Sequence, residues 1–206
     1  ARFARPDILR PVNELGRCVL KWTRACDKRI HKLFCYVQSS LAYRLTAVGG
    51  DSRDELSMHL YVDADLASEK NDTKSSNGHV LEIVGPKTSM MVAFCHKRQT
   101  STALGTPEAE IVSLCYGIRM TGFPCKDFWE FVLERTVTLK VLEDNETCIA
   151  IVKKGYSPVL RYLNRTQRVN LSWLHEVFES GEADLEYCST KAMKADIFTK
   201  SLKPLD

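Results

Sequence analysis

Residues 1–45 repeat apolar positions with the three- and four-residue spacing of a helix surface. Two stripes result, the first formed by Ile8, Val12, Leu15 and Val19 and the second by Ile30, Leu33, Phe34 and Val37. This spacing predicts two amphipathic helices that pack through their stripes. The run Gly49-Gly50-Asp51-Ser52 then interrupts the pattern, as turns do. We therefore predict a helical segment over 1–50 and a second domain over 51–206.

After this boundary the pattern changes to that of strands. Met58–Val62, Val80–Val84 and Met90–Cys95 are short apolar runs separated by polar or Gly/Pro turns, which predicts an antiparallel meander. Thr106-Pro107 is a typical helix start. We expect Gly122-Phe123-Pro124 to end that helix.

The remaining residues mix helical and strand patterns. The expected elements are a short helix over Asp127–Glu134, a strand over Val137–Leu142, a helix over 145–155, a helix over Val169–Phe178, a strand at Leu185–Tyr187 and a last helical segment from Lys191. Strands and helices in this order predict a mixed α/β domain whose sheet has flanking helices.

Composition is that of an ordinary globular protein. The chain has 206 residues, 44% of them hydrophobic, so it can bury a sizeable core. No apolar run approaches the roughly 20 residues of a membrane span. The N-terminus lacks the layout of a signal peptide, so we expect an intracellular protein. The eight cysteines contain no C-x-x-C pair, which favours reduced thiols over a zinc site or disulfides.

Charge is distributed unevenly although the formal net charge is only +3. Acidic residues exceed basic ones in the middle of the chain, whereas lysines and arginines predominate on both flanks. Basic flanks suit a nucleic-acid-binding protein, because neutralising phosphates supplies much of the affinity. Solvated helix faces would produce the same pattern. Charge alone therefore leaves both interpretations open.

Four carboxylates lie at the ends of expected elements: Asp63, Glu110, Asp144 and Asp196. Asp63 and Asp144 each follow a strand-like run, and carboxylates at the ends of neighbouring strands can converge. Like charges at one spot repel unless protons or cations neutralise them. Mg²⁺ prefers such oxygen ligands, which indicates phosphoryl transfer with two metal ions. Each acid taken singly could instead form a turn or complement a helix dipole.

The order and surroundings of the four acids resemble the ribonuclease H domain of a copia-type LTR retrotransposon Pol polyprotein. The motifs that carry the resemblance are Tyr61-Val62-Asp63-Ala64-Asp65, Lys74–Gly78, Thr106–Glu110, Glu143-Asp144-Asn145 and Ala195–Lys200. Residues 4–8, 12–15, 28–30 and 36–37 are similar to the segment that connects the reverse transcriptase to this domain. The resemblance thus covers nearly the whole chain.

The resemblance implies a ribonuclease H-like fold, a mixed five-stranded sheet with flanking helices, here preceded by an N-terminal helical pair. It implies that Asp63 bridges two Mg²⁺ ions, for which Mn²⁺ could substitute. Asp196 would share the ion that activates water, and Glu110 with Asp144 would hold the other ion. The adjacent acids Asp65 and Glu143 would face away or support the ligands. The implied substrate is the RNA strand of an RNA/DNA hybrid, recognised by 2′-hydroxyls and helix shape.

One segment departs from the family pattern. Where the family has His, Asp and His, this chain has Arg168, Asn170 and Leu174. The departure favours an alternative function, that of a domesticated retroelement fragment acting as a non-catalytic structural or docking subunit among other protein subunits. The four retained acids favour the metal-dependent endonuclease. Fold alone cannot decide between these two hypotheses.

Overall fold

A computed structural model describes residues 4–67 and 73–200 of the chain. The chain divides into two compact units, Ala1–Thr46 and Ala47–Asp206. Within the described residues, none of the helices combines the length and hydrophobicity that a membrane crossing requires.

The first unit contains two helices, α1 (Leu9–Arg17) and α2 (Arg24–Ser39), with short turns η1 (Pro6–Ile8) and η2 (Val19–Lys21) beside α1. The Tyr36 hydroxyl donates a hydrogen bond to the Asp7 carboxylate at 2.8 Å and ties α2 to the turn before α1. The predicted N-terminal helical pair is therefore present.

The predicted packing of the two apolar stripes is wrong in part. Leu15 is buried, but the side chains of Val19 and Phe34 are 63% and 66% exposed, and Val12 is also exposed. Val19 lies outside because α1 ends at Arg17 and the chain leaves the helix axis there. Leu9 and Cys26, which belong to neither stripe, are buried instead.

The second unit is built on a five-stranded sheet. Its strands are β1 (Ser57–Asp65), β2 (Ser76–Gly85), β3 (Thr88–Arg98), β4 (Leu139–Glu143) and β5 (Asp184–Tyr187), in the spatial order β3-β2-β1-β4-β5. β1, β2 and β3 form the antiparallel meander, whereas β1 pairs with β4 and β4 with β5 in parallel. This is the ribonuclease H-like mixed sheet with flanking helices that the sequence predicts.

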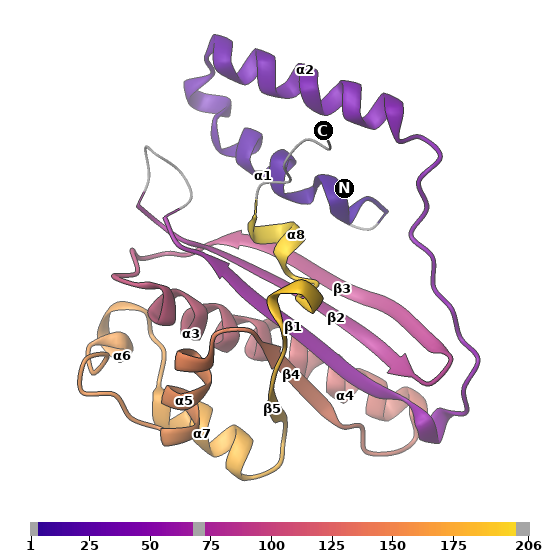
Figure 1. Cartoon of the computed structure of the whole chain (residues 1–206), viewed down its shortest axis with the longest axis vertical. Helices are drawn as coiled ribbons and strands as arrows, with labels where there is room; N and C mark the ends of the chain where they lie inside the picture. Colours follow the sequence, from indigo (N-terminus) through magenta and orange to yellow (C-terminus); the bar gives the residue numbers. More distant parts are fainter. Residues whose placement is uncertain (1–3, 68–72, 201–206) are drawn as a thin grey trace. The chain divides into compact units, whose positions relative to one another are not determined.

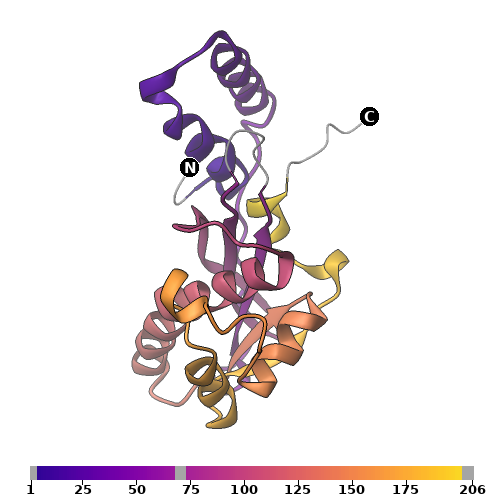
Figure 2. The same ribbon diagram turned by 90° about the vertical axis from the view of Figure 1, so that its left-hand side faces the viewer.

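Helices cover the two faces of the sheet unequally (Figures 1 and 2). The helices and turns of this unit are η3 (Arg53–Glu55), α3 (Thr106–Gly117), η4 (Ile118–Gly122), α4 (Phe123–Leu133), α5 (Glu146–Lys154), α6 (Leu163–Thr166), α7 (Leu171–Glu179), η5 (Thr190–Ala192) and α8 (Asp196–Thr199). α3, α4, α5 and α7 lie on one face, and the short helix α8 lies on the other, across β1, β2 and β3.

The main core lies between the sheet and α3. On β1 the alternate residues Met58, Leu60 and Val62 are fully buried, because successive side chains of a strand point to opposite faces. Gly117 of α3 lets this helix approach closely, since a Cβ atom there would lie 2.9 Å from Val62 Cγ1. This close packing fixes the distance between α3 and the sheet.

The helix after α3 continues instead of stopping. The expected break at Gly122-Phe123-Pro124 is wrong, because a π-helical turn, η4, joins α3 directly to α4. Gly122 is buried, and a Cβ atom there would lie 3.2 Å from side-chain atoms of Leu60 and Leu139. This glycine thus permits close packing on the sheet and does not end the helix.

Candidate metal centre

Two neighbouring parallel strands deliver the first two acids. β1 and β4 run side by side in a register that pairs Tyr61 with Leu142. Asp63 and Asp144 each lie two residues further on, at the carboxyl ends of these strands. Asp63 is only 2% exposed, whereas Asp144 is partly exposed just beyond the end of β4. Their proximity follows from the parallel pairing.

Helices on opposite faces of the sheet supply the other two acids. Glu110 lies in α3 and is 3% exposed. Asp196 is the first residue of α8. α8 can approach β2 because Gly78, which pairs with Asp63, has no side chain; a Cβ atom there would lie 2.5 Å from Thr199 Cγ2. The stacked rings of Phe94 and Phe198, 5.6 Å between centroids, also hold α8 on the sheet.

The structure brings all four acids together in two overlapping groups. Asp63, Asp144 and Asp196 form the first, which we call the Asp63 group; Glu110, Glu143 and Asp144 form the second, the Glu110 group. In each group, one carboxylate oxygen per residue lies within 4.8 Å of the others. Asp144 belongs to both groups, whereas the resemblance assigns the bridging position to Asp63.

Glu143 is the member that sequence reasoning missed. It was expected to face away or to support the ligands, but it is completely buried and approaches Glu110. The signal was present in the strand pattern: Leu139, Val141 and Glu143 are alternate residues, so Glu143 takes a core position of β4. Asp65, the other adjacent acid, belongs to neither group.

The Asp63 group has polar partners from the protein itself. The Thr199 hydroxyl donates a hydrogen bond to Asp63 Oδ2. Lys200 Nζ pairs with Asp196 Oδ1 at 2.6 Å. The Thr190 hydroxyl donates to Asp144 Oδ2 at 2.8 Å. These contacts offset part of the mutual repulsion of the three carboxylates.

Burial dominates the electrostatics of both groups. It raises the pKa of Asp63 to about 7, although the Thr199 hydrogen bond and the charge of Lys200 act in the opposite direction. Burial also raises the pKa values of Glu110 and Glu143, and each is raised further by neighbouring carboxylates. Clustered buried carboxylates favour neutralisation by protons or by hard cations, and an all-oxygen donor set suits Mg²⁺ or Mn²⁺.

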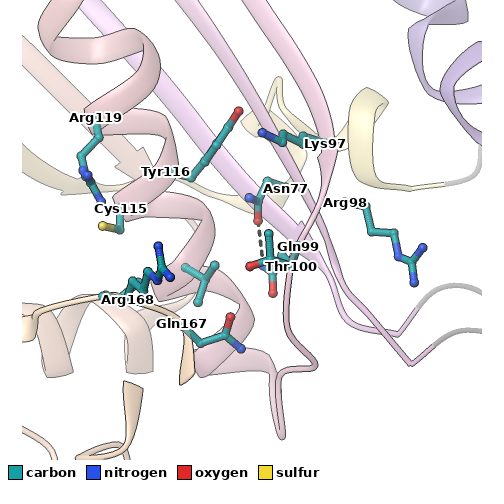
Figure 3. Close-up of a pocket in the computed structure, with 12 residues that line it drawn as sticks. Asn77, Lys97, Arg98, Gln99, Thr100, Cys115, Tyr116, Arg119, Gln167 and Arg168 are labelled. Atoms are coloured by element: carbon teal, nitrogen blue, oxygen red, sulfur yellow. Dashed lines mark hydrogen bonds between the residues drawn. The ribbon is translucent and has the colours of Figure 1, made fainter. Parts of the chain in front are cut away.

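A basic pocket lies among β2, the end of β3, α3 and the segment before α7 (Figure 3). Its lining includes the tyrosine ring of Tyr116 and four cationic side chains, those of Lys97, Arg98, Arg119 and Arg168. Lys97 Nζ is 5.0 Å from the centroid of the Tyr116 ring. The pocket is connected to α3 by Gln99, whose amide nitrogen donates to Asn77 Oδ1 at 2.7 Å and to the backbone oxygen of Ala109 at 2.9 Å. Ala109 directly precedes Glu110.

Comparison with known proteins agrees with the motifs. No model of a known protein family matches the chain. The retrovirus-related Pol polyprotein from transposon RE1 of Arabidopsis thaliana is 23% identical over 200 residues, which cover 97% of this chain and 13% of that protein. This chain thus spans about an eighth of the relative's length. The resemblance to a retrotransposon Pol polyprotein is confirmed, and the sheet is that of the expected ribonuclease H domain.

Solved structures with a similar arrangement include RNase H1 from the archaeon Halobacterium salinarum, with a TM-score of 0.45 and 18% identity over 69% of this chain and 93% of that one. LC11-RNase H1, isolated from compost by a metagenomic approach, has a TM-score of 0.47 and 14% identity over 69% of this chain and 92% of that one.

Proposed function

We propose that this chain is a metal-dependent endonuclease of the ribonuclease H type, which hydrolyses the RNA strand of RNA/DNA hybrids with two metal ions. The observation that carries the proposal is the presence of two clusters of acids, the Asp63 group and the Glu110 group, which share Asp144. Two adjoining oxygen-donor sites are what a two-metal phosphodiester hydrolysis requires. Perturbed pKa values of buried acids in such a place also favour a functional site over a purely structural one.

The residues have distinct roles in this proposal. Asp63 and Asp196 would hold one cation, Glu110 the other, and Asp144 would contribute to both. Two Mg²⁺ or Mn²⁺ ions, when bound, would supply water activation and stabilisation of the leaving oxygen. Thr199 and Lys200 would position the carboxylates of Asp63 and Asp196 through the contacts described above.

The basic pocket supports a nucleic-acid substrate. Lys97, Arg119 and Arg168 offer positive charge in the lining of the pocket, and phosphate backbones bind to such surfaces. A partly exposed ring such as that of Tyr116 can stack on a base. Selection of an RNA/DNA hybrid would rest on helix shape and 2′-hydroxyls, since single base contacts cannot read an A-form-like helix.

The altered segment at 165–175 does not contradict this proposal. Asn170 caps α7 by accepting hydrogen bonds from the backbone nitrogens of Ser172 and Trp173. Leu174 is fully buried in the core, and Arg168 lines the basic pocket. These three residues serve the helix cap, the core and the pocket lining, and none belongs to the acid groups.

A second candidate is the non-catalytic docking subunit. The outer face of α4 supports it, because Phe128 and Phe131 are 59% and 83% exposed and Val132 lies beside them. Exposed apolar side chains that cluster on one helix are typical of a protein contact. In either case residues 1–50 would be a connecting segment without chemistry; among described residues, the candidate metal-binding groups lie outside it.

Cleavage of a labelled RNA/DNA hybrid with Mg²⁺ tests the proposal. We expect the full chain to cut the RNA strand of the hybrid and to leave duplex DNA intact. Cleavage should stop when EDTA is added. Asp63→Asn should abolish cleavage while its thermal unfolding midpoint stays equal or rises, because one repelling charge is removed. If the unmodified protein leaves the hybrid intact and Mg²⁺ stabilises both proteins equally, the docking hypothesis stands alone.

A further inference from the structure

The Glu110 group contains an acid that neither the motifs nor the resemblance assigns to metal binding. Glu143 is the last residue of β4, and its exposed fraction is 0%. Strands hold β4 on both sides. β1 pairs with β4 as far as Leu142, and on the other side Glu143 itself pairs with Tyr187 of β5, while its backbone oxygen accepts a hydrogen bond from the backbone nitrogen of Cys188. Its side chain therefore reaches Glu110 from a rigid position, and not from a mobile loop.

One oxygen of Glu143 has a partner and the other has none. Oε1 accepts a hydrogen bond from the backbone nitrogen of Asn145 at 3.0 Å. Oε2 is buried and lacks a hydrogen-bond partner, and the same is true of Glu110 Oε2. Leaving a buried carboxylate oxygen without a hydrogen bond costs free energy. Two such oxygens on Glu110 and Glu143, which are neighbours in space, therefore indicate a missing ligand.

The protein itself does not supply that ligand. In the described part of the chain, no lysine or arginine forms an ion pair with Glu110 or Glu143, whereas Lys200 pairs with Asp196 in the Asp63 group. Cys148, the fully buried thiol nearby, is repelled as an anion by Glu143 and Glu110, which contribute with burial to its raised pKa. The group therefore has three carboxylates and no cationic side chain.

We propose that Glu143 is a third carboxylate ligand of the divalent cation held by Glu110 and Asp144. The proposal rests on the proposed two-metal function and extends it to a residue that the motif does not require. Its ligand atom is the unpartnered Oε2, while Oε1 stays bonded to the backbone of Asn145. Once their protons are released, three carboxylates without a paired lysine bind a divalent ion more tightly than three carboxylates of which one is paired with lysine. The Glu110 group therefore fills at a lower metal concentration than the Asp63 group.

Mn²⁺ binding to the full chain tests this assignment without measuring activity. The variants are Glu143→Gln, which keeps the shape and removes the charge, and Glu143→Leu, which continues the apolar alternation of Leu139 and Val141 and so preserves folding. Glu146→Gln is the matched control, because it removes one negative charge three residues away on the exposed first turn of α5. Free Mn²⁺ is followed by electron paramagnetic resonance, and unfolding midpoints in EDTA verify that each variant folds.

We expect two Mn²⁺ ions per unmodified chain. Both Glu143 variants should weaken the tighter site by at least about tenfold and leave the other within about twofold, since loss of even a supporting group costs that much affinity. Glu146→Gln should leave both sites unchanged. Unaltered Mn²⁺ affinity in the Glu143 variants would overturn the proposal and identify Glu110 and Glu143 as a buried pair that shares a proton.

The same titration separates the two proposals. If the unmodified protein binds two ions and the Glu143 variants lose the tighter one, the ligand assignment stands even when the RNA/DNA hybrid is not cleaved. If the hybrid is cleaved and the Glu143 variants bind Mn²⁺ normally, the ribonuclease proposal stands and the assignment fails. A wild-type chain that binds fewer than two ions overturns the assignment of Glu143.

Discussion

The Asp63 group and the Glu110 group share Asp144 but differ in how the protein balances their charge. In the Asp63 group a hydroxyl from Thr199 and an ammonium from Lys200 meet two of the carboxylates. In the Glu110 group the carboxylate oxygens of Glu110 and Glu143 include two that are buried and unpartnered. One site is thus partly neutralised within the fold, and the other depends on a proton or a cation from outside.

The difference follows from the elements that build each group. α8 ends in Thr199 and is followed by Lys200, so it brings donors together with its own acid, Asp196. β4 and α3 are packed against the core and bring only acids, because the side chains around them are apolar. The donors therefore come with the short helix α8 and the residue after it, whereas β4 and α3 contribute acids that have no cationic partner among the described residues. The two groups should therefore respond differently to substitution, to a shift of α8 and to pH.

Replacement of the shared acid has the largest expected effect. Asp144→Asn removes a ligand from both groups, so we expect hybrid cleavage to fall by about a thousandfold, the rate equivalent of roughly 4 kcal/mol. Mn²⁺ binding should weaken at both sites. Asp196→Asn is the comparison variant, because it belongs only to the Asp63 group and should weaken one site. If Asp144→Asn and Asp196→Asn each reduce the Mn²⁺ affinity of both sites equally, the division into two groups is contradicted.

A shift of α8 should separate the groups without removing any acid. Gly78→Ala introduces a Cβ atom 2.5 Å from Thr199 Cγ2 and 3.1 Å from the backbone oxygen of Ala195, so α8 must move away from β2. Because Asp196 moves with it, we expect cleavage to fall roughly 10- to 100-fold, as misplacement of about 1 Å can cause. The Mn²⁺ affinity of the Glu110 group should remain.

Gly49→Ala is the control for this shift, since no atom lies within 4 Å of the added Cβ. Its cleavage rate should equal that of the unmodified protein. If Gly78→Ala weakens both metal sites equally, α8 does not act on the Asp63 group alone.

Local patterns were sufficient to predict the sheet and to single out four of the five clustered acids. The strand runs alternate clearly, and Asp63 and Asp144 directly follow them, so parallel pairing alone brings these two acids together. Glu143 was missed because a charged residue at a strand end usually faces solvent. Its alternation with Leu139 and Val141 places it on the core face of β4, but whether this end of the strand is covered depends on helices distant in the sequence, such as α5.

The structural roles of two glycines also could not be predicted from the sequence. Gly122 stands beside Phe123-Pro124, a sequence that predicts the end of a helix. In the structure it instead lets a continuous helix pack against Leu60 and Leu139. Gly78 belongs to one of the motifs, and its place in β2 creates the space for α8 beside Asp63. In both cases the reason for a glycine is a neighbour distant in the sequence, which only the folded chain reveals.

The pH dependence of stability has the smallest expected effect and tests the charge balance directly. Burial and mutual repulsion raise the pKa values of Glu110 and Glu143 in the folded chain. The folded protein therefore holds more protons than the unfolded chain, and the metal-free protein should lose stability as pH rises from about 7 to about 8, by roughly 1.4 kcal/mol for each such proton. For a chain of this length, that corresponds to a fall of about 2–4 °C in the unfolding midpoint per kcal/mol.

The chosen window excludes the opposing contribution of a buried histidine. Burial lowers the pKa of His79 to about 4, so its folded form resists protonation and adds stability as pH rises toward the ordinary histidine value of 6.5, but not above it. Scanning calorimetry in EDTA should show the decline, and saturating Mg²⁺ should reduce it by replacing the protons. Glu143→Gln should flatten the metal-free decline more than Asp196→Asn does, because Asp196 already has Lys200 as a partner. If stability declines identically with rising pH in Glu143→Gln and Asp196→Asn, the protein neutralises the charge of the two groups to the same extent.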